Sequence, residues 1–228
     1  GYVAFEGQHL IGWRDVPVDN AGLGYSVLPT EPVIRQVFIG RGDNCADQQA
    51  FERKLLVIRK QIENRIRERD IDPSQSFYFT SLSSRTIVYK GMLLAGQVGE
   101  YYQDLNDERM VSALALVHQR FSTNTFPTWD LAQPFRMIAH NGEINTVRSN
   151  RSWMQSRERN VESAVWGERA RDLRPFLQDG LSDSGSLDNV FELLLRTDTP
   201  ASEEWCAAVR HLAGKGFANQ FGEQRFGS

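Results

Sequence analysis

Three short polar clusters carry side chains that could bind a substrate or stabilise a reacting group. The first covers residues 118–125, in which Arg120 is followed by hydroxyl and amide side chains that include Thr123. A planar guanidinium binds a carboxylate through two parallel hydrogen bonds, and neighbouring hydroxyls complete such a site. This composition is that of a carboxylate-binding corner, although a surface arginine beside a turn has the same sequence.

The second cluster is the pair Asn141-Gly142, which follows an apolar run. Both residue types tolerate positive φ, so the pair is typical of a tight hairpin turn. The pair could also form an oxyanion hole, because an Asn side-chain amide and a glycine backbone N–H can donate to one developing oxyanion. The spacing leaves both interpretations open.

The third cluster, residues 182–185, reads Ser-Asp-Ser-Gly just before an apolar helical pattern. Serine and aspartate are favoured caps at helix N-termini. In a second interpretation, Asp183 binds an ammonium group. A carboxylate binder, an oxyanion hole and an ammonium binder together would make a receptor for a free amino acid.

Neither cysteine has the sequence context of a nucleophile or a metal ligand. Cys45 lies in the polar loop 41–45, where we expect an incidental thiol, and Cys206 has no histidine at helical contact spacing. No serine stands in a G-x-S-x-G turn, and His118 and His140 have no thiolate partners for zinc. We expect a substrate site without a nucleophile or metal among these residues.

The elements that must position these clusters are a mixture of helices and strands. Apolar residues at helical spacing predict helices, the first with a solvated charged face, over 47–69, 90–105, 144–159 and from 182 onward. Runs rich in β-branched and aromatic residues predict strands at 32–39, 77–82, 85–89, 112–118 and 135–140. Strands in hairpin-like pairs between helices predict an α+β layered fold.

The composition of the 228-residue chain narrows the class of protein. Hydrophobic residues make up 40% and charged residues 24%, which is enough apolar material for a core and excludes wholesale disorder. The formal net charge is −3, so a nucleic-acid partner is not expected. No apolar run approaches the ~20 residues that span a bilayer, and no signal-peptide pattern begins the chain. We expect a cytoplasmic protein that binds no membrane.

The longest informative runs surround the same three clusters. They are residues 118–129 (His-Gln-Arg-Phe-Ser-Thr-Asn-Thr-Phe-Pro-Thr-Trp), 131–136 and 139–146 (Ala-His-Asn-Gly-Glu-Ile-Asn-Thr), with shorter runs at 12–17, 81–92 and 181–188. In this order, and over roughly residues 8 to 200, the chain resembles the N-terminal class II glutamine amidotransferase domain of glutamate synthase large (alpha) subunits.

The resemblance implies a four-layer αββα sandwich of the N-terminal-nucleophile hydrolase type, and the hydrolysis of L-glutamine. In that family an N-terminal cysteine attacks the carboxamide, forms a thioester and releases ammonia. By resemblance, Arg120 binds the α-carboxylate of glutamine with Thr123 beside it, and Asp183 holds the α-ammonium group. Asn141 and Gly142 form the oxyanion hole.

The resemblance also implies cofactors and partners for the full-length enzyme. Ammonia would react with 2-oxoglutarate at a distant FMN site, and an iron–sulfur cluster is expected, with no cofactor bound by this segment. The expected partners are the remaining domains of the large subunit and a small subunit or ferredoxin. The electron donor stays open among NADPH, NADH and ferredoxin, and the location is the cytoplasm, or the plastid stroma for a plastid enzyme.

The chain departs from the family pattern at both ends. The nucleophilic cysteine belongs well upstream of Gly12, and the family would continue into further strands beyond Pro200. We therefore expect a partial amidotransferase domain over 1–200, incomplete at both ends and inactive alone, and an atypical tail over 201–228 with one short helix. Two alternatives stay open: another class II amidotransferase, such as one making phosphoribosylamine, glucosamine phosphate or asparagine, and a non-catalytic glutamine-binding module.

Overall fold

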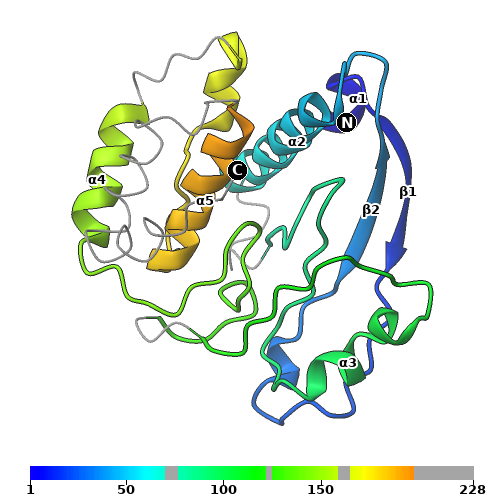
Figure 1. The fold of residues 1–228 in the computed structure, drawn as a ribbon. Helices are drawn as coiled ribbons and strands as arrows, with labels where there is room; N and C mark the ends of the chain where they lie inside the picture. Colours follow the sequence, from blue (N-terminus) through cyan, green and yellow to red (C-terminus); the bar gives the residue numbers. More distant parts are fainter. Residues whose placement is uncertain (70–76, 122–124, 159–164, 198–228) are drawn as a thin grey trace, which may run out of the picture. The chain divides into compact units, whose positions relative to one another are not determined.

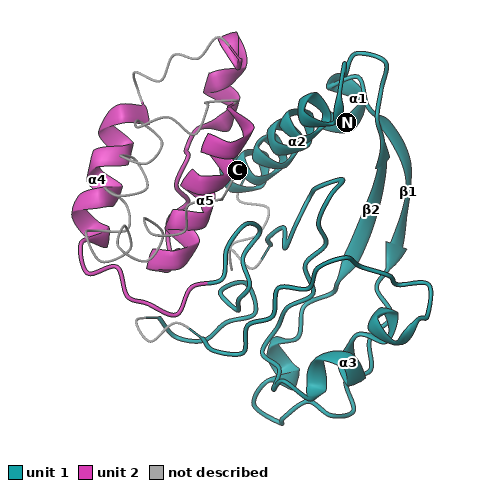
Figure 2. Ribbon diagram, viewed as in Figure 1, with its two compact units in different colours: residues 1–139 teal, residues 140–228 magenta. Residues whose placement is uncertain are grey.

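The computed structural model describes residues 1–69, 77–121, 125–158 and 165–197, and the chain divides into two compact units, residues 1–139 and 140–228 (Figure 2). Helices and strands are both present, so the predicted mixed character of the fold is confirmed. The boundary expected near residue 200 and the helix expected beyond it lie outside the described residues. Both stay predictions.

An antiparallel pair of strands lies near the start of unit 1. Strand β1 (His9–Asp15) follows the single turn α1 (Tyr2–Phe5) and pairs with β2 (Arg35–Gly40), with a register shift between Leu10 and Gly12 (Figure 1). The strand predicted over 32–39 is therefore present, displaced by a few residues. The described residues also contain three short 3₁₀ helices: η1 (Leu28–Thr30), η2 (Gln103–Asn106) and η3 (Gly167–Leu173).

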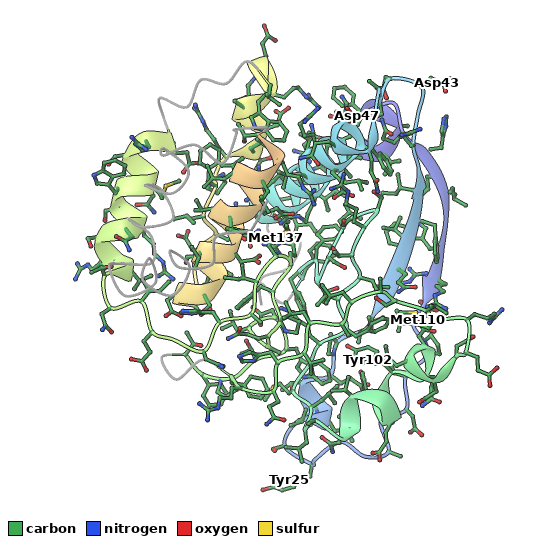
Figure 3. All side chains as sticks on the ribbon, viewed as in Figure 1. Tyr25, Asp43, Asp47, Tyr102, Met110 and Met137 are labelled. Atoms are coloured by element: carbon green, nitrogen blue, oxygen red, sulfur yellow. The ribbon has the colours of Figure 1, made fainter. Side chains whose placement is uncertain are left out.

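The long helix α2 (Gln48–Glu68) begins where the sequence predicts it. Asp47, labelled in Figure 3, is the N-cap residue, and its carboxylate accepts a hydrogen bond of 2.7 Å from the backbone N–H of Ala50. This bond satisfies one of the N–H groups that a helix leaves free at its start. Phe51 and Leu55, two members of the predicted apolar stripe, are buried in one core cluster.

The prediction of a solvated charged face on α2 is wrong in part, because four charged side chains on the helix are buried: Glu52, Arg59, Lys60 and Glu63. Arg59 donates to Glu63 at 3.0 Å, and the two side chains form an i,i+4 pair that is almost fully buried. The Glu52 carboxylate accepts hydrogen bonds from the Ser83 hydroxyl at 2.9 Å and from the Ser84 backbone N–H at 2.6 Å. Buried charges are tolerated when they are paired and hydrogen-bonded in this way.

Four predicted strands do not form among the described residues: segments 77–82, 85–89, 112–118 and 135–140. An extended segment becomes a strand only when its backbone groups bond to a neighbouring segment. Within the described part of the chain, β1 and β2 make the one sheet. Apolar side chains of 112–118 are accordingly exposed, with Leu114 at 83% and Val117 at 81%.

An aromatic cluster forms a second core in unit 1, beside the short helix α3 (Gln97–Tyr101). The helix predicted over 90–105 is therefore two short pieces, α3 and η2. The rings of Tyr101 and Tyr102 meet edge to face with centroids 4.8 Å apart, and Trp129 lies 5.7 Å from Tyr101. The Tyr102 hydroxyl, labelled in Figure 3, donates to the Lys90 carbonyl at 2.7 Å. Each buried hydroxyl of this pair has a partner, since Tyr101 donates to the Glu31 carboxylate at 2.7 Å.

Unit 2 contains two longer helices, α4 (Val147–Glu158) and α5 (Asp183–Arg196). Both predicted helices of this region are confirmed, with α4 beginning three residues later than expected. Val147, Arg151 and Met154 are half-buried along one side of α4, as the predicted stripe requires. None of the helices in the described ranges is both long enough and apolar enough to cross a membrane.

The tyrosines of unit 1 predict a loss of stability in alkaline solution. Burial and a hydrogen bond to Asp104 raise the pKa of Tyr89 from 10.0 to about 12, and burial raises the pKa of Tyr101 and Tyr102 as well. A raised pKa in the folded state means that this stabilisation is complete below pH 10 and is lost as the pH rises towards 12. We expect the urea midpoint of unfolding to fall over that interval.

The control for this prediction is Tyr89→Phe, which removes the titrating hydroxyl. Its urea midpoint should fall less steeply over the same pH interval than that of the parent protein, because one group fewer gains charge on unfolding. Equal slopes for parent and variant would contradict the assignment of the effect to Tyr89.

Candidate functional site

The loop 140–144 is bonded at both of its ends to the first turn of α5. At one end, Nδ1 of His140 lies 3.0 Å from the Ser184 hydroxyl. At the other end, the backbone N–H of Ile144 donates to Oδ2 of Asp183 at 2.8 Å. Two residues 39 positions apart in the chain are thus joined by a buried hydrogen bond, and the Asn-Gly pair of the second cluster lies between the two attachment points.

Asp183 uses both carboxylate oxygens in this arrangement. Oδ2 accepts from Ile144, and Oδ1 accepts from the backbone N–H of Ser184 at 2.7 Å. The side chain is 6% exposed. An ionised carboxylate can accept about four hydrogen bonds, so it can still receive a donor from a ligand. The cap of α5 is Ser182, whose hydroxyl accepts from the Gly185 N–H at 3.0 Å, so Asp183 is not the capping residue.

Arg151 of α4 holds the chain just before α5. Its Nη2 donates to the carbonyl of Leu181 and, at 3.1 Å, to that of Ser182, while its Nε donates to the Ser186 hydroxyl at 3.0 Å. Hydrogen bonds from a charged donor are stronger than neutral ones. The guanidinium therefore fixes the segment that carries Asp183, from a helix that lies about thirty residues earlier in the sequence.

The hairpin interpretation of Asn141-Gly142 is wrong. The preceding segment, residues 135–140, forms no strand, and the φ of Gly142 lies outside the left-handed region that a two-residue hairpin turn of this kind requires. Asn141 and Gly142 are exposed, whereas Ile144 is buried at the end of the loop. The oxyanion-hole interpretation is compatible with this exposure and stays a prediction.

The first cluster lies in unit 1. Arg120 is exposed, and its backbone N–H donates to Nδ1 of His118 at 3.1 Å. Thr123 lies outside the described residues. The proposed carboxylate-binding role of both residues stays a prediction.

Cys45 is a structural residue rather than an incidental loop thiol. It is buried at 6% exposure and packs with Phe51 and Leu55. Its Sγ lies 3.6 Å from the side-chain oxygen of Gln8, which also accepts from the Gly42 backbone N–H at 2.9 Å. Cys206 lies outside the described residues. Among the residues that are described, no three His, Cys, Asp or Glu side chains group as metal ligands would.

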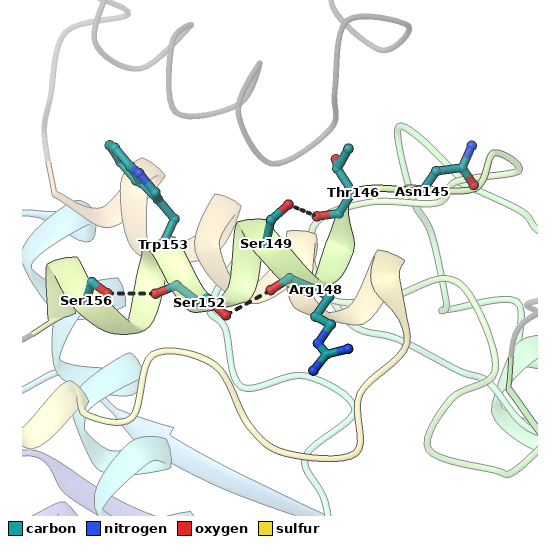
Figure 4. A pocket seen from close by; sticks show the side chains of 7 residues that line it. All are labelled: Asn145, Thr146, Arg148, Ser149, Ser152, Trp153 and Ser156. Carbon is teal, nitrogen blue, oxygen red and sulfur yellow. Dashed lines mark hydrogen bonds between the residues drawn. The ribbon is translucent and has the colours of Figure 1, made fainter.

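A hollow lies over α4 and the end of the run 139–146. Its lining side chains all come from the segment that begins α4 and from α4 itself: Asn145, Thr146, Arg148, Ser149, Ser152, Trp153 and Ser156 (Figure 4). Three of its serine hydroxyls donate to backbone carbonyls of the same segment. The hydroxyls are therefore already engaged, and the hollow contains none of the predicted site residues.

The sequence does not indicate the role of the residues that hold the site together. These are His140, Ile144, Arg151 and Ser184, which act through hydrogen bonds to residues that lie 30 to 44 positions away in the chain. The signal available in the sequence was the unbroken run 139–146, which includes the first two of them. No local sequence pattern predicts that this run contacts Ser184.

Comparison with known proteins decides the class to which this chain belongs. Residues 2–220 match the class-II glutamine amidotransferases. The chain belongs to this family. The resemblance that the runs around Arg120, Asn141 and Asp183 indicate is confirmed, and the amidotransferase match covers both compact units.

Individual relatives of this amidotransferase chain are glutamate synthases. The chain is 48% identical over 195 residues to the glutamate synthase (NADPH) large chain of Azospirillum brasilense, and 52% identical over 190 residues to that of Bacillus subtilis. It is 44% identical over 200 residues to the chloroplastic ferredoxin-dependent glutamate synthase of Oryza sativa. These alignments cover 86%, 83% and 87% of the chain but 13%, 12% and 12% of the relatives, so the chain spans about one-eighth of their length.

The contacts of Arg151 predict that its loss loosens the start of α5. In Arg151→Leu, the carbonyl groups of Leu181 and Ser182 lose a charged donor, which contributes about 1.5–3 kcal/mol per interaction. We expect a lower free energy of unfolding in urea and faster hydrogen exchange of the Gly185 amide.

The matched control is Arg148→Leu, the same change at an exposed position of the same helix. Surface substitutions of this kind usually change stability by less than about 0.5 kcal/mol. If the Gly185 amide exchanges at the same rate in both variants, and both have the same free energy of unfolding, Arg151 does not fix the start of α5.

Proposed function

We propose that this chain is the glutamine-hydrolysing part of a glutamate synthase large subunit. The proposal depends above all on the loop 140–144 and its bond to Asp183, because that short piece of structure combines an exposed Asn-Gly pair with a buried carboxylate. The relatives, at 44% to 52% identity, support L-glutamine as the substrate.

We extend the proposal to the fold. In the four-layer αββα sandwich of N-terminal-nucleophile hydrolases, two antiparallel sheets lie between layers of helices. Membership in the amidotransferase family supports this architecture, and so does the strand-forming composition of 112–118, whose apolar side chains are exposed. In that architecture these residues would pair with neighbouring strands.

In the proposed site, each polar group of glutamine has one matching group on the protein. Arg120, with Thr123 beside it, binds the α-carboxylate, since a guanidinium can form two parallel hydrogen bonds to it. Asp183 binds the α-ammonium group with the acceptor capacity that Ile144 and Ser184 leave free.

The proposed reaction transfers the acyl group of the carboxamide to a cysteine thiolate. Sulfur attacks the carboxamide carbon, and the oxygen becomes an oxyanion that the Asn141 side-chain amide and the Gly142 N–H stabilise. The nitrogen takes a proton and leaves as ammonia, which yields a thioester that water hydrolyses to glutamate. Cys45 is engaged in the core, so we propose that the nucleophile is the N-terminal cysteine of the family, outside these 228 residues.

In the whole protein, we propose that the ammonia reacts with 2-oxoglutarate and that FMN mediates the reduction to glutamate. The residues of this chain do not fit an iron–sulfur cluster, which takes four thiolates, since the sequence contains two cysteines. We therefore propose that the cluster lies in another domain, and by the likeness to glutamate synthases we propose the same for FMN. We propose that a small subunit or ferredoxin supplies the electrons, in the cytoplasm or the plastid stroma, which the names of NADPH- and ferredoxin-dependent relatives support.

The substitution Asn141→Asp tests the function. In the full-length protein, which carries the N-terminal cysteine, the parent should release one ammonia for each glutamine hydrolysed. The variant replaces an amide donor with a negative charge that faces a developing oxyanion. Loss of one such donor lowers kcat by about 10²–10³, and the repulsion adds to this loss. We expect at least a ~100-fold decrease, measured as ammonia release.

The matched control is Asn145→Asp, the same chemical change at an exposed residue four positions along the chain. We expect its kcat to stay close to that of the parent. If Asn141→Asp retains kcat within a few-fold while its melting curve is unchanged, Asn141 is not an oxyanion donor. If the parent binds glutamine but releases no ammonia, the chain belongs to a non-catalytic binding module.

Asp183→Asn tests recognition of the ammonium group. The parent should prefer glutamine over the analogue that lacks the α-amino group by about 1.5–3 kcal/mol, which corresponds to about 10- to 150-fold in kcat/KM. Asparagine is neutral and also donates where Asp183 now accepts from Ser184, so both substrates should react more slowly. The ratio of the two kcat/KM values is not affected by a loss that both substrates share. In Asp183→Asn this ratio should shrink towards one. An unchanged preference would show that Asp183 only supports the loop.

A further inference from the structure

The ring of His140 contacts two residues of the proposed site. Its Nδ1 is 3.0 Å from the hydroxyl of Ser184, a residue that is 2% exposed. The adjoining edge of the ring, formed by Cε1 and Nε2, lies near Gly142. A Cβ atom placed on Gly142 would be 2.8 Å from Nε2 and 3.0 Å from Cε1 of His140. The imidazole therefore occupies the space that a side chain at position 142 would need.

This contact gives a physical reason for glycine at position 142. Its φ lies outside the left-handed region, so the backbone conformation is open to any L-residue. What excludes a side chain is the imidazole ring, which the bond to Ser184 keeps from turning away. Glycine is needed here for close approach rather than for conformational freedom.

Ser184 also connects His140 to the carboxylate of Asp183. The backbone N–H of Ser184 donates to Oδ1 of Asp183 at 2.7 Å, and the hydroxyl of Ser184 lies 3.4 Å from the same oxygen. The other oxygen of Asp183 accepts from Ile144. A continuous set of contacts therefore runs from the carboxylate through Ser184 and His140 to Gly142, and a second contact reaches the far end of the loop.

We infer that His140 is a positioning residue that holds the backbone of Gly142 in the orientation needed to stabilise the oxyanion. The inference rests on the proposed function of the loop 140–144. His140 acts through Gly142 and Ser184 and does not itself touch the substrate. Since the same contacts reach Asp183, the site that binds the ammonium group and the oxyanion hole form one rigid piece.

The first test separates the two contacts of the ring by substitution in the full-length protein. In His140→Asn, the side-chain amide keeps a polar atom where Nδ1 lies, but Cε1 and Nε2 are gone. In His140→Ala, both contacts are lost. Misplacement of a reacting group by about 1 Å can cost about 100-fold in rate. We expect kcat for glutamine hydrolysis to fall ~10- to 100-fold in His140→Ala, with KM little changed, and to fall less in His140→Asn.

The second test uses Gly142→Ala, which places a methyl group against the ring. Alone, this change should lower both kcat and the melting temperature, because the methyl group and the imidazole collide. Combined with His140→Asn, it should be better tolerated, so that the double variant is more active and more stable than Gly142→Ala. His9→Ala, the same loss of an imidazole at an exposed position of β1, is the control and should leave both quantities unchanged.

The outcomes distinguish this inference from the proposed function. If His140→Asn lowers the kcat and melting temperature of Gly142→Ala further, the ring does not control position 142 and the inference is overturned, while hydrolysis by the parent still supports the function. A rise in KM with kcat unchanged in His140→Ala would also overturn it. A third outcome separates the two claims. If the parent hydrolyses no glutamine but the double variant melts at a higher temperature than Gly142→Ala, the contact between His140 and Gly142 is supported and the proposed function fails.

Discussion

The arrangement of unit 2 depends on one buried carboxylate. Asp183 lies in the first turn of α5, where the unsatisfied N–H groups of a helix favour negative charge. Each of its oxygens accepts a backbone N–H, one from Ser184 beside it and one from Ile144, which lies 39 residues earlier. Without an acceptor at this position, the buried N–H of Ile144 would lose its partner, at a cost of about 1–3 kcal/mol. The loop 140–144 therefore has a defined shape because α5 begins where it does.

Around this carboxylate, hydrogen bonds between polar groups hold the chain segments in position. Arg151 donates to two carbonyl groups and one hydroxyl at the start of α5, and Ser182 caps the helix. Such a network has few alternative arrangements, because breaking one bond leaves a buried group unsatisfied. Unit 1 uses the same principle, since the buried Glu52 accepts hydrogen bonds from Ser83 and Ser84. Both units hold irregular segments in place with buried charge.

This rigidity suits the proposed chemistry. An oxyanion hole is effective when its donors are already oriented before charge develops, because no reorganisation is then needed during the reaction. A loop fastened at His140 and at Ile144 leaves Asn141 and Gly142 exposed while fixing the backbone on both sides of them. Substrate recognition by Asp183 and stabilisation of the oxyanion would then share one set of supports.

Local pattern predicts much of the helical structure and little of the strand structure. The cap at Asp47, the start of α5 behind Ser182 and the stripe on α4 all follow from interactions within a few residues, so the sequence indicates them directly. The segments 77–82 and 112–118 have the composition of strands, but a strand also needs a partner, which local pattern does not supply. The prediction of a solvated face on α2 was wrong for a similar reason, because Glu52 finds its partners at Ser83 and Ser84.

For the site, the sequence alone was enough to recognise the family and to predict which residues carry chemistry. Long uninterrupted runs around Arg120, Asn141 and Asp183 were sufficient for that, since family motifs are local in the chain. The folded chain is needed to show that Gly142 lies against the ring of His140, and that Asp183 accepts a bond from Ile144 while Ser182 caps α5. The bond from Ile144 to Asp183 joins residues 39 positions apart, and the His140 ring lies beside Ser184, 44 positions further on. Such contacts depend on distances in space that sequence spacing does not encode.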